Sequence, residues 1–281
     1  SPHGGLDQTR LNTWRVVAPE KQIHLVTLAS AALILPASKL EYTELVEADF
    51  PEDRLQQLPP GIEITPANPD AARSFRQTYQ WADSDLIGLY LGRSDPKAGI
   101  HHLMRAYQRI RVRLPELKLL VQIQEPEQID DWKRRAELLE VNLGIRFCGP
   151  LSHAERSQAL CAADVVVATD RNPGVELAPL EALLCGTPIV VSKDSGVGEW
   201  LEPCNGAYFF PASDAEVLAI GLVQALTESH GAHERLNQGR ECVQTHFNWH
   251  DIIDQTEQIY SQALQLQLNQ EVIEVKQPAQ S

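Results

Sequence analysis

Two cations stand at the point where a buried apolar run gives way to an amphipathic stretch. Arg93 and Lys97 follow the apolar run 86–92, and a helical pattern over 100–113 comes directly after them. The start of a helix offers backbone N–H groups and a favourable dipole to an anion. A guanidinium adds a bidentate clamp, and an ammonium adds a point charge. The pattern predicts a phosphate-binding loop, and the alternative is a surface turn with two ordinary cations.

A second segment combines carboxylates with a loop that leads into a helix. Residues 164–192 have the pattern of a strand, a glycine-containing loop, a helix, a turn at Gly186 and another strand. Glu181 lies inside that helix, five residues after Glu176. A carboxylate here is more often a surface group, but at this position it could reach the crevice of a sheet and accept two ribose hydroxyls. The buried stripe of the helix is predicted to be formed by Leu177, Leu180 and Leu184.

The remaining motifs are weaker. Asp83 and Asp85 form a D-x-D at the start of a strand, where a solvated loop is the default interpretation, because ligands of open α/β sheets bind at the other ends of the strands. His101 and His102 open a helix and are expected on its solvated face. No G-x-G-x-x-G, P-loop or H-E-x-x-H motif occurs.

The elements that must position these residues alternate along the chain. Nearly continuous apolar runs, typical of strands buried on both faces, occur at 86–92, 117–124, 145–149, 164–169, 187–192 and 207–210. Helical patterns occur at 100–113, 126–141, 152–162, 176–185, 213–228, 231–246 and 249–266. Strand, helix, strand at this spacing predicts a parallel sheet with right-handed crossovers. The predicted fold is a Rossmann-like, doubly wound α/β domain over 67–266. A polar tail over 267–281 is expected to fray.

The first 66 residues predict only part of a second α/β domain. A helix is expected at 38–49 and short strands at 32–36 and 55–59, while four prolines mark 59–81 as a linker. An α/β domain with only two strands cannot cover its own sheet. This part is therefore expected to be an incomplete remnant or to be completed by a partner chain. Because the chain starts at Ser1, we expect a fragment or a processed product.

Composition and charge exclude several classes of protein. The 281 residues are 43% hydrophobic and 22% charged, which is typical of globular proteins. The formal charge of −14 argues against nucleic-acid binding, which needs a basic face. The five cysteines include no C-x-x-C pair, which indicates a reducing compartment and thiols used as small hydrophobic groups. We expect a cytoplasmic protein, with peripheral attachment to a membrane left open.

The two sites, in this order, resemble the C-terminal domain of family 4 glycosyltransferases, which have the GT-B architecture. The resemblance covers about 86–266. Its motifs are Gly92-Arg93 with Gly99, Glu181-Ala182 with Cys185-Gly186-Thr187-Pro188, Gly198-Glu199, and Phe247-Asn248-Trp249 with Tyr260. A weaker similarity links Ser1-Pro2-His3-Gly4 to the His-Gly loop of the family's N-terminal domain.

The resemblance implies a function and a set of site residues. It implies transfer of a sugar from a nucleotide-diphospho-sugar to a saccharide or lipid acceptor, with retention of configuration and with no metal or other cofactor. His3 would face the transferred sugar. The donor would be held by Arg93, Lys97, Val175, Glu176, Leu177, Glu181 and Glu199.

Three positions depart from the family's pattern. The family's lysine normally stands where this chain has Ala98, so Lys97 is one residue short. The first glutamate of the family's pair would stand at Pro173, and a glycine is usual at Glu176. A carboxylate at roughly 4 Å from a phosphate oxygen would cost about 4 kcal/mol at an effective dielectric constant of 20. A glycosyltransferase impaired in this chain is the leading hypothesis, and a catalytically inactive binding or scaffold protein is the alternative.

Overall fold

The computed structural model describes residues 30–63, 69–93 and 99–276. The chain divides into two compact units, and each is described by itself. The first comprises residues 1–62, 173–175 and 247–281, and the second comprises 63–172 and 176–246. The sequence placed residues 247–266 with the large α/β domain, whereas the contacts place them in the first unit.

The second unit is built on a six-stranded parallel sheet with the order β3-β2-β1-β4-β5-β6. Its strands are β1 (Leu86–Tyr90), β2 (Leu117–Gln122), β3 (Ile145–Cys148), β4 (Val165–Ala168), β5 (Ile189–Ser192) and β6 (Tyr208–Phe210). Every neighbouring pair is parallel; Leu86 pairs with Leu117, for example, and Gly88 pairs with Val165. This confirms the predicted Rossmann-like α/β fold. The order reverses between β1 and β4, which makes the carboxyl ends of these two strands the expected ligand crevice.

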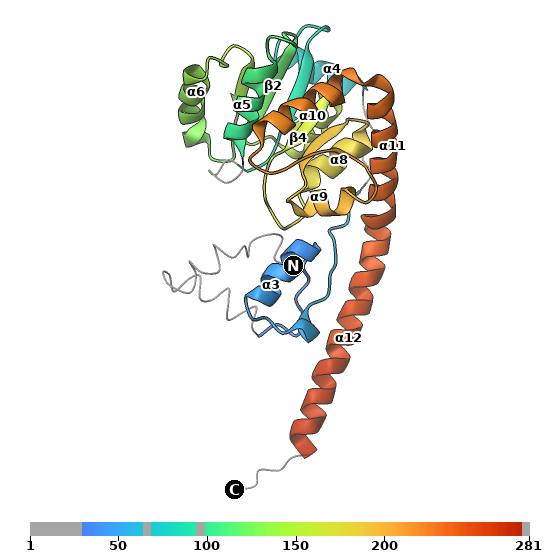
Figure 1. The fold of residues 1–281 in the computed structure, drawn as a ribbon. Coiled ribbons are helices and arrows are strands. Elements are labelled where there is room, and N and C mark those ends of the chain that lie inside the picture. The colour runs from blue at the N-terminus through green and yellow to red at the C-terminus, as the bar shows by residue number, and fades with distance from the viewer. Residues whose placement is uncertain (1–29, 64–68, 94–98, 277–281) are drawn as a thin grey trace. The chain divides into compact units, whose positions relative to one another are not determined.

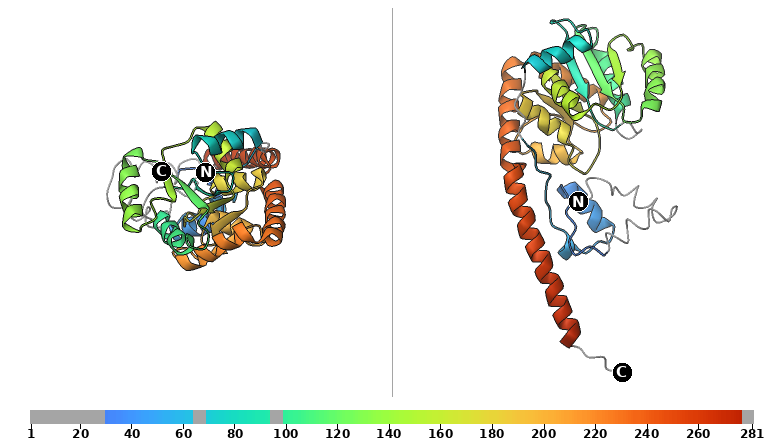
Figure 2. Two further views of the ribbon diagram at one scale, coloured as in Figure 1. Left: turned by 90° about the horizontal axis from the view of Figure 1, so that it is seen from above. Right: turned by 180° about the vertical axis from the view of Figure 1, so that it is seen from behind.

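Helices lie on both faces of this sheet (Figures 1 and 2). They are α4 (Pro69–Thr78), α5 (Ile100–Ile110), α6 (Ile129–Leu138), α7 (His153–Ala162), α8 (Leu177–Cys185), α9 (Gly196–Leu201), α10 (Ala215–Thr227) and α11 (Ser229–His246), with a 3-10 turn at Pro126–Gln128. Helix α5 packs on α10, while α7 packs on α4 and α8. The predicted linker was wrong in part because α4 occupies 69–78. Helix α9 was not predicted.

Burial explains why these segments pair as they do. All four residues of β4 and all four of β5 are buried, as expected for central strands covered on both faces. Helix α7 starts at a capping box, in which the Ser152 hydroxyl accepts from the Glu155 N–H and the Glu155 carboxylate accepts from the Ser152 N–H. Helix α8 ends at Gly186, whose φ of 92° is left-handed and therefore favours glycine.

Two surface predictions need correction. Leu177 keeps 37% of its surface exposed, so it does not join the buried stripe, because α8 instead buries its alanines and its other leucines. His101 and His102 are half-buried rather than solvated, with ring centroids 3.9 Å apart, and burial lowers the pKa of both imidazoles.

The first unit is smaller in its described part. It contains α3 (Lys39–Glu47), a 3-10 turn at Glu52–Arg54 and α12 (Trp249–Lys276). Ser38 caps α3 by accepting from the Glu41 N–H. The two predicted strands form only a single parallel bridge, between Ile34 and Leu55.

Helix α12 runs ten residues past the predicted end of its helix. The expected fraying from residue 267 is therefore wrong as far as Lys276. No proline occurs between Trp249 and Pro278 to interrupt the helix. Within the described part of the chain, no helix combines the length and the apolar character needed to span a bilayer.

Candidate functional site

The carboxyl ends of β1 and β4 approach each other closely. Gly99, the N-cap of α5, has a left-handed φ of 81°, and a Cβ placed on it would lie 2.8 Å from the Cβ and Oγ1 atoms of Thr169. Thr169 directly follows β4. Glycine is therefore needed at position 99 for two reasons, the backbone conformation and the space. This packing sets the start of α5 against the end of β4.

An ion pair spans the same point. The Nε atom of Arg93 lies 2.8 Å from Oδ2 of Asp170, and its NH2 group lies 3.3 Å from Oδ1. The Asp170 side chain is 3% exposed, whereas that of Arg93 is 29% exposed. The buried carboxylate thus orients a guanidinium that still reaches solvent. The hydroxyl of the buried Tyr90 donates to the Arg93 carbonyl at 2.7 Å, which fixes the backbone of the loop.

Glu176 brings a second carboxylate to this region. It occupies the N-cap position of α8, but its side chain makes no capping hydrogen bond. Burial and the charge of Asp170 raise the pKa of Glu176 to about 7, against the opposing effects of Arg93 and Arg156. Glu176 and Asp170 also help burial to raise the pKa of Tyr90 well above its ordinary value. The site therefore contains an acid that titrates near neutrality.

Glu181 faces a cation of the neighbouring helix. Its Oε2 atom accepts from both Nε and NH2 of Arg156 in α7, at 2.9 and 2.8 Å. Both side chains are 26% exposed. Arg93 and Arg156 both act to lower the pKa of Glu176. The side chains of Arg93, Glu176, Arg156 and Glu181 therefore form a series of charges that alternate in sign. A ribose that bound Glu181 would have to share this carboxylate with Arg156.

Glu199 lies in the first turn of α9. The Ser195 hydroxyl caps this helix by accepting from the Gly198 N–H at 3.0 Å. A Cβ on Gly198 would lie 2.3 Å from the Ser192 carbonyl oxygen, so a side chain cannot fit there. The Gly196 N–H donates to the Asn172 carbonyl at 2.9 Å. This bond connects the start of α9 with the loop that follows β4.

The other predicted residues are placed as follows. Val175 is buried and belongs to the first unit, and Leu177 is the first residue of α8. His3 and Lys97 lie outside the described residues. The structure thus brings Arg93 and Glu176 into one electrostatic cluster and places Glu181 at its edge.

Two functional candidates were missed by sequence reasoning. Asp170 directly follows the predicted strand 164–169, so its place at a strand's carboxyl end was a usable signal. Arg156 gave no such signal, because only the packing of α7 on α8 brings it to Glu181.

The arrangement is suited to an anion. Helices α5 and α8 both begin without a side-chain cap, as does α6, whereas α7, α9 and α10 are capped by Ser152, Ser195 and Asp214. An anion at an uncapped helix start is stabilised by backbone N–H groups and the helix dipole. Arg93 supplies the matching positive charge, whereas Asp170 and Glu176 oppose the anion.

Residues 72–241 match the family described as glycosyl transferases group 1. This match covers more than half of the chain. The chain belongs to this family. The curated relatives include glycogen synthase of Mycobacterium tuberculosis, 29% identical over 173 residues that make up 61% of this chain and 41% of that protein. An uncharacterised glycosyltransferase of Methanocaldococcus jannaschii is 26% identical over 257 residues, 86% of this chain and 63% of that one. This chain thus spans about two fifths to two thirds of the length of these relatives.

Solved structures agree on the fold of this group 1 family member. Anabaena HepE, crystallised with UDP and glucose, has a TM-score of 0.77 and 19% identity, covering 88% of this chain and 68% of that one. Sucrose-phosphate synthase of Thermosynechococcus elongatus has a TM-score of 0.73 and 24% identity, covering 90% and 65%. The likeness shows the GT-B type of Rossmann-like fold.

Proposed function

We propose that this chain supplies the donor-binding part of a retaining, nucleotide-sugar-dependent glycosyltransferase of the family 4 type. The observation that carries the proposal is the Arg93 guanidinium, held by buried Asp170 at the reversal of strand order. The two uncapped starts of α5 and α8 add to it. These groups suit the diphosphate of a nucleotide-sugar better than an uncharged ligand.

The relatives support a nucleotide-sugar donor. HepE was crystallised with UDP-glucose, and a related mannosyltransferase of Corynebacterium glutamicum is described as GDP-mannose-dependent. Because the two nucleotides differ in their base and share the diphosphate, the support concerns the diphosphate end of the donor. The acceptor, a saccharide or a lipid, is proposed from the resemblance alone. The cytoplasmic location is proposed from the five cysteines, which include no C-x-x-C pair.

The transfer step would rely on charge at the leaving group. The diphosphate gains negative charge as the glycosidic bond to the sugar breaks, and Arg93 with the backbone N–H groups would stabilise that charge. Glu181 would accept hydrogen bonds from the ribose hydroxyls, and Glu199 would support the loop 195–198. His3 would face the sugar. No metal ion is assigned to this step.

A specific observation also favours the alternative, a catalytically inactive binding or scaffold protein. Glu176 places a carboxylate at the start of α8, and Asp170 lies near enough to raise its pKa. Both carboxylates would repel the diphosphate, so donor binding and turnover should be weak. In this alternative the chain keeps the fold of the family and has lost the transfer activity.

Calorimetric titration with UDP, GDP and ADP at low and moderate salt tests donor binding. We expect Arg93→Ala to weaken the binding of the preferred nucleotide by about 2–3 kcal/mol, because it removes a charge-assisted bidentate contact. Arg113→Ala, at an exposed residue in the turn after α5, is the matched control and should leave affinity unchanged. Since Arg93→Ala leaves a buried carboxylate behind, the double variant Arg93→Ala/Asp170→Asn checks that any loss is not misfolding. An unchanged affinity in a folded variant would refute the diphosphate assignment.

A further inference from the structure

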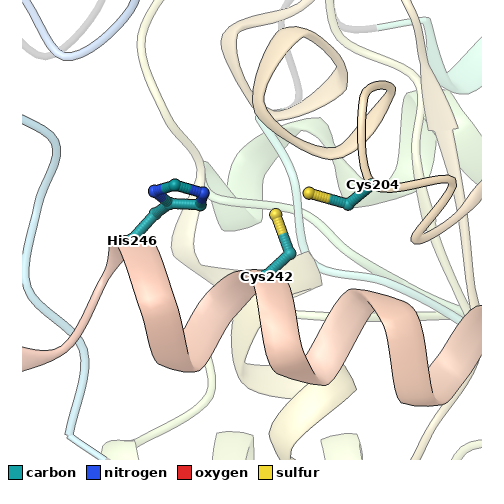
Figure 3. A group of neighbouring side chains, drawn as sticks. All are labelled: Cys204, Cys242 and His246. Carbon is teal, nitrogen blue, oxygen red and sulfur yellow. The ribbon is translucent and has the colours of Figure 1, made fainter.

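A compact group of two thiols and one imidazole lies in the second unit. Cys242 and His246 are four residues apart on α11 and so share one face of the helix, and Cys204 comes from the turn after α9. One ligand atom of each side chain lies within 4.8 Å of the other two. Figure 3 shows the three side chains directed toward one another. Neither the predicted donor residues nor the proposed transfer reaction uses them.

The turn that carries Cys204 packs closely against the backbone of α11. A Cβ on Gly206 would lie 2.6 Å from the Cα of Gly239, and a Cβ on Gly239 would lie 2.6 Å from the Gly206 carbonyl oxygen. Two glycines thus allow the turn and the helix to touch backbone to backbone. Gly239 is one helical turn before Cys242, so this contact also fixes the distance between the two thiols.

Polar contacts hold the same turn in register. Asn205 has a left-handed φ of 51°, its carbonyl side-chain oxygen accepts from Arg235, and its amide donates to Gln238 at 3.2 Å. Arg235, Gln238, Gly239, Cys242 and His246 follow helical spacing and form one face of α11. The cluster is therefore held by packing and hydrogen bonds that do not involve its own sulfur atoms.

The ligand set is typical of a soft or borderline divalent cation. Zinc binds thiolate sulfur at about 2.3 Å and imidazole nitrogen at about 2.0 Å in tetrahedral sites, which places two ligand atoms roughly 3.5–4 Å apart. Separations of up to 4.8 Å therefore need only small side-chain rotations. Cys242 is 3% exposed and Cys204 is half-buried, whereas His246 is exposed. The exposed imidazole gives an entry path for the ion and leaves a fourth position open to water.

We propose that Cys204, Cys242 and His246 form a zinc site that joins the turn after α9 to the last turns of α11. Both thiols donate to the Trp200 carbonyl, with Cys204 Sγ at 3.9 Å and Cys242 Sγ at 3.5 Å. Binding converts both thiols to thiolates, and their two protons go to the buffer while neutral His246 supplies a nitrogen lone pair. The Trp200 ring lies 5.4 Å from the His246 ring, so the ion would also fix the end of α9, the helix that carries Glu199.

The test uses the full chain, reduced and stripped with a chelator, and then titrated with Zn²⁺ against a chromophoric competitor. We expect one ion per chain, with affinity reduced at least about 100-fold in Cys204→Ser and in His246→Ala. His246→Ala alters an exposed residue, so its fold should survive even if changes at buried Cys242 do not. Cys161→Ser/Cys185→Ser removes the neighbouring thiols of α7 and α8, whose sulfurs lie 2.9 Å apart, and should bind zinc as the parent does.

Two further readouts identify the ligands. Co²⁺ in place of Zn²⁺ should give thiolate charge-transfer absorption that is lost in Cys204→Ser, and free zinc at about 100 times its dissociation constant should raise the melting temperature by about 4 °C. Zinc binding that is equal in the parent and in His246→Ala and Cys204→Ser would overturn the proposal. So would loss of binding only in the Cys161→Ser/Cys185→Ser control, or a Cys204–Cys242 disulfide that persists in the reduced protein.

Discussion

Arg93 and Asp170 form an ion pair, 2.8 Å from Nε to Oδ2, across the point where the strand order of the sheet reverses. Arg93 follows β1 and Asp170 follows β4, two strands that are neighbours in space although their last residues, Tyr90 and Ala168, are 78 positions apart along the chain. The buried partner is the acid, and the partly exposed partner is the cation. This asymmetry aims the positive charge at the crevice.

The asymmetry predicts unequal costs for the two partners. Arg93→Ala leaves a buried carboxylate without its guanidinium and should lower the free energy of unfolding by about 3–5 kcal/mol. Asp170→Asn leaves a guanidinium that is 29% exposed and should cost only about 1–2 kcal/mol. Urea unfolding of both variants and of the double variant measures this. Equal costs, or a greater cost for Asp170→Asn, would contradict the view that burial of the acid dominates.

Glu176 should make stability depend on pH. Its ordinary pKa is 4.5 and its pKa in the folded chain is about 7. Between these values the folded chain keeps a proton that the unfolded chain has lost, so stability is lost as pH rises from 4.5 to 7. Relative to the parent, Glu176→Gln should gain up to about 3 kcal/mol above pH 7 and little at pH 4. Unfolding curves at several pH values test this, and a difference that does not vary with pH would argue against it.

Glu181 should matter for the nucleoside and not for the diphosphate. If Glu181 holds the ribose, Glu181→Gln should weaken binding of a nucleoside diphosphate about tenfold, the loss of a charged hydrogen bond, and leave inorganic pyrophosphate binding unchanged. Arg156→Ala is the matched control, because it removes the competing cation and keeps the carboxylate. Calorimetry with both ligands gives the comparison. Equal losses of affinity for the nucleoside diphosphate and for pyrophosphate would refute the assignment of Glu181 to the ribose.

Two glycines with positive φ should respond differently to alanine. At Gly186, with φ 92°, an added Cβ would meet no atom of the described residues within 4 Å beyond its immediate chain neighbours, so Gly186→Ala should cost only the left-handed strain of about 1–2 kcal/mol. At Gly99, with φ 81°, the added Cβ also meets Thr169 at 2.8 Å, so Gly99→Ala should cost clearly more. Thermal or urea unfolding of the two variants measures the difference. Equal costs would show that the approach of α5 to β4 is not tight.

We expect this chain by itself to form little or no transfer product. Ala98 and Pro173 replace a lysine and a glutamate of the family's pattern, and Glu176 puts negative charge where the diphosphate would lie. Product formation from several nucleotide-sugars with broad acceptors tests this for the chain and for Ala98→Lys/Glu176→Gly. Activity only in the double variant would support the expectation. Clear turnover by the unmodified chain would refute it.

The parallel sheet could be predicted because local patterns carry the information it needs. Runs of Val, Ile and Leu bounded by Gly and Pro reveal strands buried on both faces, and the amphipathic stretches between them require crossovers. All six strands predicted for the large sheet are present, with ends shifted by at most two residues. Helix α9 escaped because its six residues hold two glycines, and its start depends on the Ser195 cap and the Asn172 carbonyl.

The sequence by itself determined the six strands of the large sheet, most of the helices and the loop that places Arg93 at a strand's carboxyl end. Only the tertiary structure decided which side chains meet: Asp170 with Arg93, Arg156 with Glu181, and Cys204 with Cys242. The physical reason is that periodicity reports which face of an element is buried and leaves open which element covers that face. Pairings between residues 25 to 77 positions apart arise from the packing of whole helices and strands, which no short window of sequence contains.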